Sequence, residues 1–159
     1  EESGMKDKDI AAAAQRLIDS PYSLGDDSKG WNCLSMIWHF YGTLGISLPR
    51  EFKGFSAENY AERWKKGEGR EELHEYLMGL GQPVEPNYER NGDLLIFDAE
   101  TWVFPGIYLG SGHFLAAYER GTMCCPFKFF RKSLRGIRRL GRDQARSSVG
   151  AVIENNIWG

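Results

Sequence analysis

Cys33 stands at the start of an apolar stretch, directly behind a loop rich in glycine and aspartate, in a chain of 159 residues with three cysteines. The stretch from Lys29 to Arg50 reads KGWNCLSMIWHFYGTLGISLPR. A cysteine at a helix N-terminus lies near the positive end of the helix dipole, which stabilises a thiolate. Nucleophilic catalysis also requires a base that takes up a proton and returns it to the leaving group. Cys33 is therefore a candidate nucleophile that needs an imidazole beside it.

Three histidines are available as partners for this cysteine. His39 lies six residues further along the same expected helix, roughly 240° around its axis, so it faces elsewhere. His74 falls in an acidic helical stretch, where we expect an exposed or capping role. His113 lies at the end of the glycine-rich turn GSGH and is the best candidate for the base beside Cys33.

Hydrophobic periodicity predicts helices in the first half of the chain and strands in the second. Helices are expected within residues 5–20, 56–66 and 70–80. A further helix is expected to begin at Cys33, with an apolar stripe of Cys33, Ile37, Phe40 and Leu44. Strands are expected at residues 93–97, 101–110, 113–120, 122–127 and 148–154. This order indicates an α+β fold in which N-terminal helices pack on an antiparallel sheet or meander.

Length and composition indicate one ordinary globular domain over residues 1–159. The chain is 42% apolar and 26% charged, and no apolar run approaches the length of a membrane span. We divide it into an N-terminal helix (1–20), a loop and helical part (21–90) and a sheet with a basic segment (91–159). The N-terminus lacks a signal-peptide core. Cytoplasmic residence, association with a phage or secretion machine, and excision from a secreted chain all remain open, as does the oligomeric state.

Charge is distributed unevenly along the sequence. Residues 1–120 hold 12 basic and 20 acidic side chains, whereas residues 121–159 hold 8 basic and 2 acidic ones. The formal net charges of the two parts are therefore −8 and +6. The basic excess lies in residues 128–146. This segment fits nucleic acid, an anionic cell-wall polymer or the acidic half of the same chain, and we favour a solvated face that balances the acidic half. No nucleic-acid motif accompanies it, so we expect no nucleic-acid partner.

Two further groups of residues suggest chemistry only weakly. Cys124, Cys125 and His113 could contribute metal ligands, but no second spaced pair of ligands appears, so we predict buried strand cysteines and neither a metal nor a cofactor. Asp26 and Asp27 form either a carboxylate pair or a solvated turn, and we favour the turn.

Several motifs in register resemble NlpC-type cell-wall cysteine peptidases, which have a papain-like fold. The segment PYSLGDDSKGWNCLSMIWHFYGTLGISLPR is similar to the family pattern of Pro-Tyr-x-x-Gly-Gly, a loop, Gly-Phe-Asp-Cys-Ser-Gly, an apolar helix and Gly-Ile-x-Leu-Pro-Arg. NGDLLIF and PGIYLGSGHFLAA resemble the family's Gly-Asp-Leu strand and His-Val-Gly-Ile-Tyr-Leu-Gly hairpin. The resemblance covers residues 21–117. It implies cleavage of amide bonds in peptidoglycan stem peptides by a cysteine, a histidine and a polar third residue.

The sequence departs from this pattern at the positions that handle protons. Cys33 matches the family's nucleophile, but Phe104 occupies the position of the family's histidine and Ala116 occupies the position of its polar third residue. Asn32 replaces the aspartate that usually helps to hold the amino group of the stem peptide, whereas the substrate-facing Tyr22 is retained. The resemblance therefore implies a former substrate groove lined by Tyr22, Asn32, Phe104 and Ala116.

Two functions follow from these residues. The favoured one is a non-catalytic protein that binds a peptidoglycan-derived peptide or a protein partner through the former active-site groove. The alternative is an active thiol hydrolase or acyltransferase in which Cys33 is assisted by His113. Regular strand alternation places His113 on the opposite face from Ala116, so the alternative requires a bulge in the turn at Gly110 or Gly112.

Overall fold

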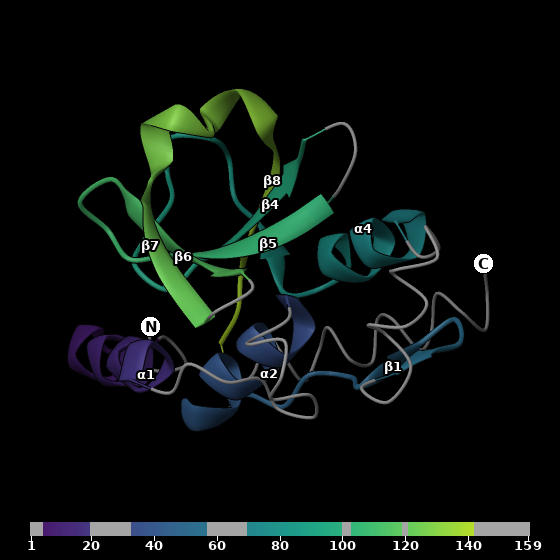
Figure 1. Cartoon of the computed structure of the whole chain (residues 1–159), viewed down its shortest axis with the longest axis horizontal. Helices are drawn as coiled ribbons and strands as arrows, with labels where there is room; N and C mark the ends of the chain where they lie inside the picture. The colour runs from purple at the N-terminus through teal and green to yellow at the C-terminus, as the bar shows by residue number, and fades with distance from the viewer. Residues whose placement is uncertain (1–4, 20–32, 57–69, 100–102, 119–120, 142–159) are drawn as a thin grey trace.

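The computed structural model describes residues 5–19, 33–56, 70–99, 103–118 and 121–141 (Figure 1). In these segments, helices α1, α2 and α4 accompany an antiparallel sheet of six strands in the order β3-β8-β4-β5-β6-β7. Figure 1 shows α1 and α2 below the sheet and α4 beside it. The helices are α1 (Asp7–Asp19), α2 (Cys33–Thr43) and α4 (Arg70–Met78), and the strands are β3 (Gln82–Pro83), β4 (Leu94–Asp98), β5 (Val103–Tyr108), β6 (His113–Tyr118), β7 (Gly121–Pro126) and β8 (Leu134–Arg139). The predicted α+β architecture is confirmed.

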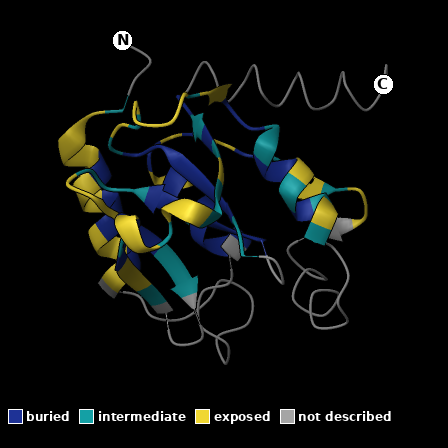
Figure 2. Cartoon of the chain, turned by 90° about the horizontal axis from the view of Figure 1, so that it is seen from above, coloured by how far each residue is buried: buried dark blue, intermediate teal, exposed yellow. Residues whose placement is uncertain are grey.

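Helix α1 forms because its apolar residues recur with helical spacing. Ile10, Ala13, Ala14 and Leu17 are buried, and the intervening residues are exposed. Two aspartates lie in the first turn and Arg16 in the last, so both ends complement the helix dipole. Figure 2 shows the resulting division into a buried inner side and an exposed outer side.

Helix α2 is buried on nearly all sides. The predicted stripe was too narrow, because Leu34, Met36, Trp38 and Tyr41 are buried together with Ile37 and Phe40. Gly45 ends the helix with a positive φ of 85°, and the N–H of Ile46 donates to the carbonyl of Tyr41 at 2.8 Å. A helix that is apolar all round must lie inside the protein, so α2 is the centre of the helical layer.

The sheet separates two hydrophobic cores. The helix-side core joins the buried residues of α1, α2 and α4 to one face of the sheet, which contributes Leu94, Ile96, Val103, Ile107 and Leu115. The aromatic cluster covers the other face and includes Phe97, Phe104, Phe114, Phe127 and Phe130. Strand β4 contributes to both, which explains its continuous apolar run LLIF.

Strand β8 changes part of the expectation of a solvated basic face. The basic residues from 128 to 135 are exposed as expected, whereas Arg138 and Arg139 of β8 are partly buried. Strand β8 lies between β3 and β4 and so forms an interior strand of the sheet. The side chain of Arg138 donates to the carbonyls of Leu80 and Gly81 at 2.6 and 3.1 Å. Arg139 pairs with Asp93 at 2.9 Å, so the basic segment does balance the acidic half of the chain, but from within the sheet.

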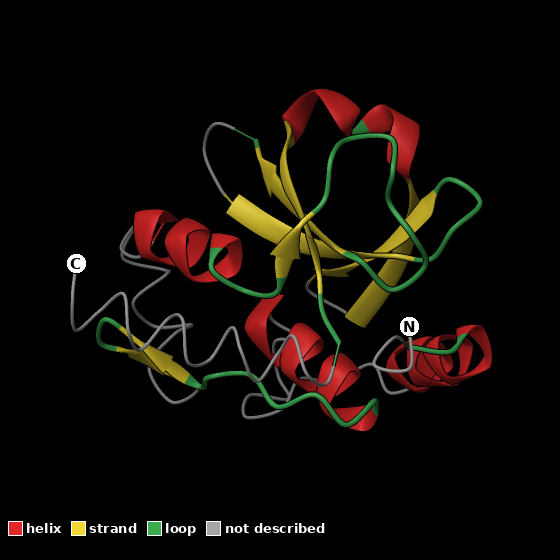
Figure 3. Ribbon diagram, turned by 180° about the vertical axis from the view of Figure 1, so that it is seen from behind, coloured by secondary structure: helices red, strands yellow, loops and turns green. Residues whose placement is uncertain are grey.

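Other expectations fall partly outside the described residues. The strands predicted at 93–97, 101–110, 113–120 and 122–127 correspond to β4, β5, β6 and β7. The short hairpin of β1 (Glu51–Phe52) and β2 (Phe55–Ser56), which Figure 3 shows apart from the main sheet, was not predicted. The helix expected at 56–66, beyond Ser56, and the strand expected at 148–154 lie outside the described residues.

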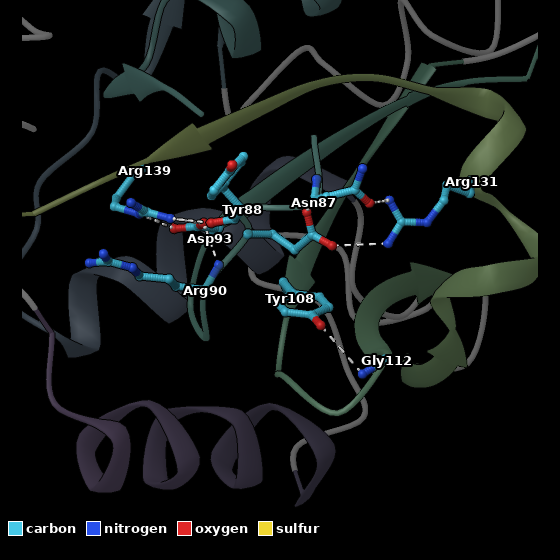
Figure 4. Close-up of polar contacts among 9 residues, drawn as sticks. Asn87, Tyr88, Arg90, Asp93, Tyr108, Gly112, Arg131 and Arg139 are labelled. Atoms are coloured by element: carbon cyan, nitrogen blue, oxygen red, sulfur yellow. Dashed lines mark hydrogen bonds and ion pairs between the residues drawn. The ribbon is translucent and has the colours of Figure 1, made fainter. Parts of the chain in front are cut away.

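Asp93, at the start of β4, joins the end of β8 to the loop before β4 (Figure 4). Asp93 is 1% exposed, and its carboxylate accepts two hydrogen bonds from Arg139, at 3.0 and 2.9 Å, and one from the N–H of Arg90 at 2.8 Å. Arg139 also donates to the carbonyl of Tyr88 at 2.9 Å. The ion pair therefore holds the end of β8 and the loop before β4 in one arrangement.

Replacing Asp93 by alanine is expected to lower the free energy of unfolding by about 3–5 kcal/mol, because it leaves the Arg139 guanidinium without its charged partner. Urea unfolding monitored by circular dichroism measures the change. Glu75→Ala is the control: it removes an exposed ion pair with Lys53 and should cost no more than about 1 kcal/mol. Equal effects of the two substitutions would contradict a structural role for the Asp93–Arg139 pair.

Candidate functional site

Cys33 is the first residue of α2, as the sequence predicted. Its backbone therefore lies at the positive end of the helix dipole. Its side chain lies outside what the structure describes, as do Tyr22 and Asn32 and the carboxylates Asp26 and Asp27.

Two buried phenols anchor the helix that carries Cys33. Tyr41 donates to the carbonyl of Gly92 at 2.8 Å, which joins α2 to the start of β4. Trp38 donates from its indole N–H to the Tyr76 hydroxyl at 2.9 Å, and Tyr76 donates to the carbonyl of Pro49 at 2.5 Å. Burial raises the pKa of both tyrosines above the ordinary value, so both remain neutral hydrogen-bond donors at neutral pH.

The two residues that the resemblance matches to the proton-handling positions lie on one face of the sheet, opposite the face that packs on α2. Phe104 in β5 and Ala116 in β6 both pack in the aromatic cluster. Phe104 is 5% exposed, and its ring stacks on Phe97 with centroids 4.9 Å apart and an interplanar angle of 19°. Gly106, two residues along β5, leaves room for this packing, since a Cβ there would lie 2.6 Å from the Phe114 ring. The position matched to a catalytic imidazole is thus a packing position.

The three histidines lie on separate elements. His39 is on α2, and burial together with the positive charge of Arg16 on α1 lowers its pKa. His74 is half-buried on α4. His113 is exposed at the start of β6, and its ring nitrogen Nδ1 lies 3.0 Å from the carbonyl oxygen of Ser111. The structure does not bring the imidazoles together at one site.

The register of β6 is regular. Leu115 pairs with Ile107 of β5, and all six residues of β6 pair in sequence with β7. Leu115 belongs to the helix-side core and Ala116 packs on the aromatic cluster. Because side chains alternate along a strand, His113 shares the face of Leu115, opposite Ala116. The turn itself takes up positive φ values at Gly110, Ser111 and Gly112 without shifting that register.

Sequence reasoning missed the residues that fix the site rather than those that would react. Asp93 and Tyr41 meet on either side of Gly92, within the motif NGD that precedes β4. The motif itself was the available signal, since an aspartate directly before a buried apolar strand needs a partner. In the described segments, no three potential metal ligands cluster, and none of the helices is long and apolar enough to cross a bilayer.

This arrangement defines an α+β domain with a cysteine at the start of a central buried helix and an antiparallel sheet packed on that helix. The sequence matches the model of the NlpC/P60 family over residues 19–139. The chain belongs to the NlpC/P60 family. No curated protein matches the sequence.

Solved structures with the same fold include both hydrolases and a non-catalytic protein. An NlpC/P60 family protein from Bacillus cereus has a TM-score of 0.56 and 19% identity, over 84% of this chain and 40% of that one. RipD from Mycobacterium tuberculosis, described as a non-catalytic NlpC/p60 domain protein adapted to peptidoglycan binding, has a TM-score of 0.55 and 19% identity, over 84% and 96%. The peptidoglycan hydrolase RipB from Mycobacterium tuberculosis has a TM-score of 0.55 and 17% identity, over 85% and 64%. At these identities the similarity concerns the fold.

Substituting Phe104 by alanine is expected to lower the free energy of unfolding by about 3–5 kcal/mol, because it opens a cavity among stacked rings. Phe129→Ala is the matched control: Phe129 is 71% exposed, and its truncation should change stability by less than about 0.5 kcal/mol. Urea unfolding of the two variants gives the comparison. A small effect at Phe104 would show that its ring is dispensable for packing and that the position is open to another role.

Proposed function

We propose that this NlpC/P60 domain is non-catalytic and binds a peptidoglycan-derived peptide through the groove beside Cys33. The observation that carries the proposal is the role of Phe104. The position that the resemblance matches to the base holds a buried ring stacked on Phe97. Ala116, matched to the residue that would orient the base, has no polar group to offer.

The chemistry of amide cleavage explains why these two residues matter. A thiol of ordinary pKa, about 8.5, is only a few per cent thiolate at neutral pH, and a neighbouring imidazolium is what usually lowers that value. The departing amide nitrogen must also receive a proton, and general acid catalysis contributes roughly 10²–10⁴-fold. Neither phenylalanine nor alanine can donate a proton. The helix dipole at Cys33 supplies only a part of the thiolate stabilisation.

The fold is compatible with a binding function. RipD, described as a non-catalytic NlpC/p60 domain protein adapted to peptidoglycan binding, has a similar fold over most of this chain. The chain also retains Tyr22, the residue that the resemblance matches to a substrate-facing tyrosine. On this match, Tyr22 is the residue that a peptide ligand would contact.

Cys33 is expected to react with iodoacetamide with the pH dependence of an ordinary thiol, with an apparent pKa near 8.5 or above. Mass spectrometry of the labelled peptides separates it from the other two cysteines. Cys124 is free and exposed, so the prediction that both strand cysteines are buried was wrong for it, and it serves as the internal reference for accessible labelling. Burial, with a smaller contribution from Cys124, raises the pKa of Cys125, so it should label last.

The opposite result would support the alternative function. An apparent pKa of Cys33 well below the ordinary thiol value of about 8.5, together with release of peptides from peptidoglycan that is abolished in Cys33→Ser and in His113→Gln, would establish an active thiol hydrolase or acyltransferase. The non-catalytic proposal would then be wrong.

Binding is tested by cosedimentation of the protein with purified, insoluble peptidoglycan. The wild type and Cys33→Ser are expected to sediment equally, whereas Tyr22→Ala should bind about tenfold more weakly, because an aromatic contact is typically a large part of a small interface. Tyr88→Ala, which truncates an exposed tyrosine on the loop before β4, is the matched control and should bind like the wild type. No sedimentation of the wild type, or equal effects of the two tyrosine substitutions, would contradict peptide binding in this groove and favour a protein partner.

A further inference from the structure

The turn between β5 and β6 forms one wall of an open pocket of about 520 Å³. Residues 111–113 line this hairpin pocket on one side, and residues 126–129 with Arg131 line it on the other. Figure 1 shows that this turn projects from the edge of the sheet, away from α2. The pocket is therefore separate from the start of α2, where Cys33 lies, and it contains the histidine that the catalytic alternative invokes.

The backbone of the turn is held in an uncommon conformation. Ser111 has a φ of 54° between two glycines that also have positive φ, and side chains other than glycine adopt this region rarely. Its carbonyl oxygen lies 3.0 Å from His113 Nδ1. The carbonyl of Gly112 accepts a hydrogen bond from the N–H of Phe127 at 2.8 Å. Both walls of the pocket are thus tied to each other before any ligand binds.

The hydrogen bond to Ser111 determines what His113 can offer. A carbonyl oxygen only accepts, so Nδ1 carries the proton. In the neutral ring, Nε2 is then an acceptor that is not used by this contact. His113 is exposed, so Nε2 can accept a hydrogen bond from the hydroxyl group of a polar ligand.

The charged groups around the pocket leave a positive excess. The ammonium group of Lys128 lies 5.2 Å from the centre of the Phe129 ring and is exposed to solvent. The guanidinium of Arg131 lies 4.1 Å from the centre of the Phe127 ring and pairs with Glu89 at 2.9 Å (Figure 4). Two cations face one carboxylate among these groups, so the rim of the pocket carries one net positive charge and favours an anion.

Phe129 adds an apolar surface next to this charge. Its ring is 71% exposed, although the neighbouring Phe127 is buried in the aromatic cluster. Ligand sites commonly combine an apolar wall with a few placed polar groups. A ligand that satisfies both parts has an anionic group, hydroxyls and a flat apolar face. Acidic saccharides have this combination.

We propose that the hairpin pocket binds an anionic saccharide, with its carboxylate or phosphate at Lys128, its ring face on Phe129 and a hydroxyl at His113. This site does not depend on the function of the groove at Cys33. It would give the domain a second point of attachment to an acidic polysaccharide or to a phosphate-bearing polymer of sugars.

Three probes that differ only at carbon 6 test the proposal: glucose, glucuronic acid and glucose 6-phosphate, with inorganic phosphate as a fourth. Each is titrated into the full-length ¹⁵N-labelled protein, and amide chemical shifts are followed by NMR. At least one of the two acidic sugars should shift the amides of Gly112, His113 and Lys128 and bind about tenfold more tightly than glucose. The better of the two identifies the anion, carboxylate or phosphate.

Variants then separate the contributions of charge and ring. Lys128→Gln should reduce the affinity for the acidic sugar about tenfold, whereas Lys132→Gln, which removes a neighbouring exposed lysine that does not line the pocket, should leave it unchanged. Phe129→Ala should weaken sugar binding but not the binding of inorganic phosphate. Any of three results would overturn the proposal. Glucose could bind as tightly as both acidic sugars, inorganic phosphate could bind as tightly as glucose 6-phosphate, or the two lysine substitutions could have equal effects. Tyr22→Ala should not alter these titrations, so failure here and failure of the groove are separate results.

Discussion

The burial of α2 on all sides is the constraint on which the rest of the structure depends. An eleven-residue helix with seven apolar or aromatic residues, distributed around its axis, must be covered by other elements. α1 covers it from one side, and the sheet covers it from another through the helix-side core. The polar groups of Trp38 and Tyr41 each find a partner on a neighbouring element, since an unpaired buried donor would cost about 1–3 kcal/mol. The start of the helix, at Cys33, is consequently fixed relative to the sheet.

The sheet divides the chemistry of the protein between its two faces. One face supports α2 and so determines where the cysteine backbone lies, whereas the other face contains the residues at the matched proton-handling positions. That second face is a continuous aromatic cluster, in which Phe97 contacts Phe104, Phe114, Phe127 and Phe130. The cluster extends to the segment after β7. The packing around Phe104 therefore also supports the wall of the hairpin pocket, to which Phe127 contributes.

The sequence was sufficient where local pattern and tertiary environment agree. The helical spacing of Ile10, Ala13 and Leu17 predicted α1, and the apolar run of residues 93–97 predicted β4, because burial follows directly from those patterns. It failed for β8, whose sequence LRGIRR looks like a solvated segment. Arg138 and Arg139 are acceptable inside the sheet because the carbonyls of Leu80 and Gly81 and the carboxylate of Asp93 accept their hydrogen bonds. Those partners lie more than 40 residues away in the sequence, so no local pattern indicates them.

The candidate site shows the same limit. Motif order placed Cys33 at the start of a helix and put Phe104 and Ala116 on strands, and the structure locates their backbones accordingly. What motif order did not indicate is that Phe104 stacks on Phe97, because that contact depends on the pairing of β4 with β5.

Packing and catalysis compete directly at position 104. An imidazole there would have to remain in the aromatic cluster, where its ring nitrogens would lose their hydrogen bonds to water at a cost of about 1–3 kcal/mol. Alternatively, it would have to turn out of the cluster and leave a cavity next to Phe97 and Phe130. Either arrangement weakens the face of the sheet that Phe104 now completes. A single substitution of Phe104 by histidine would therefore supply the residue type of the matched family position without a site that can use it, since the surrounding rings would also have to be replaced by polar partners.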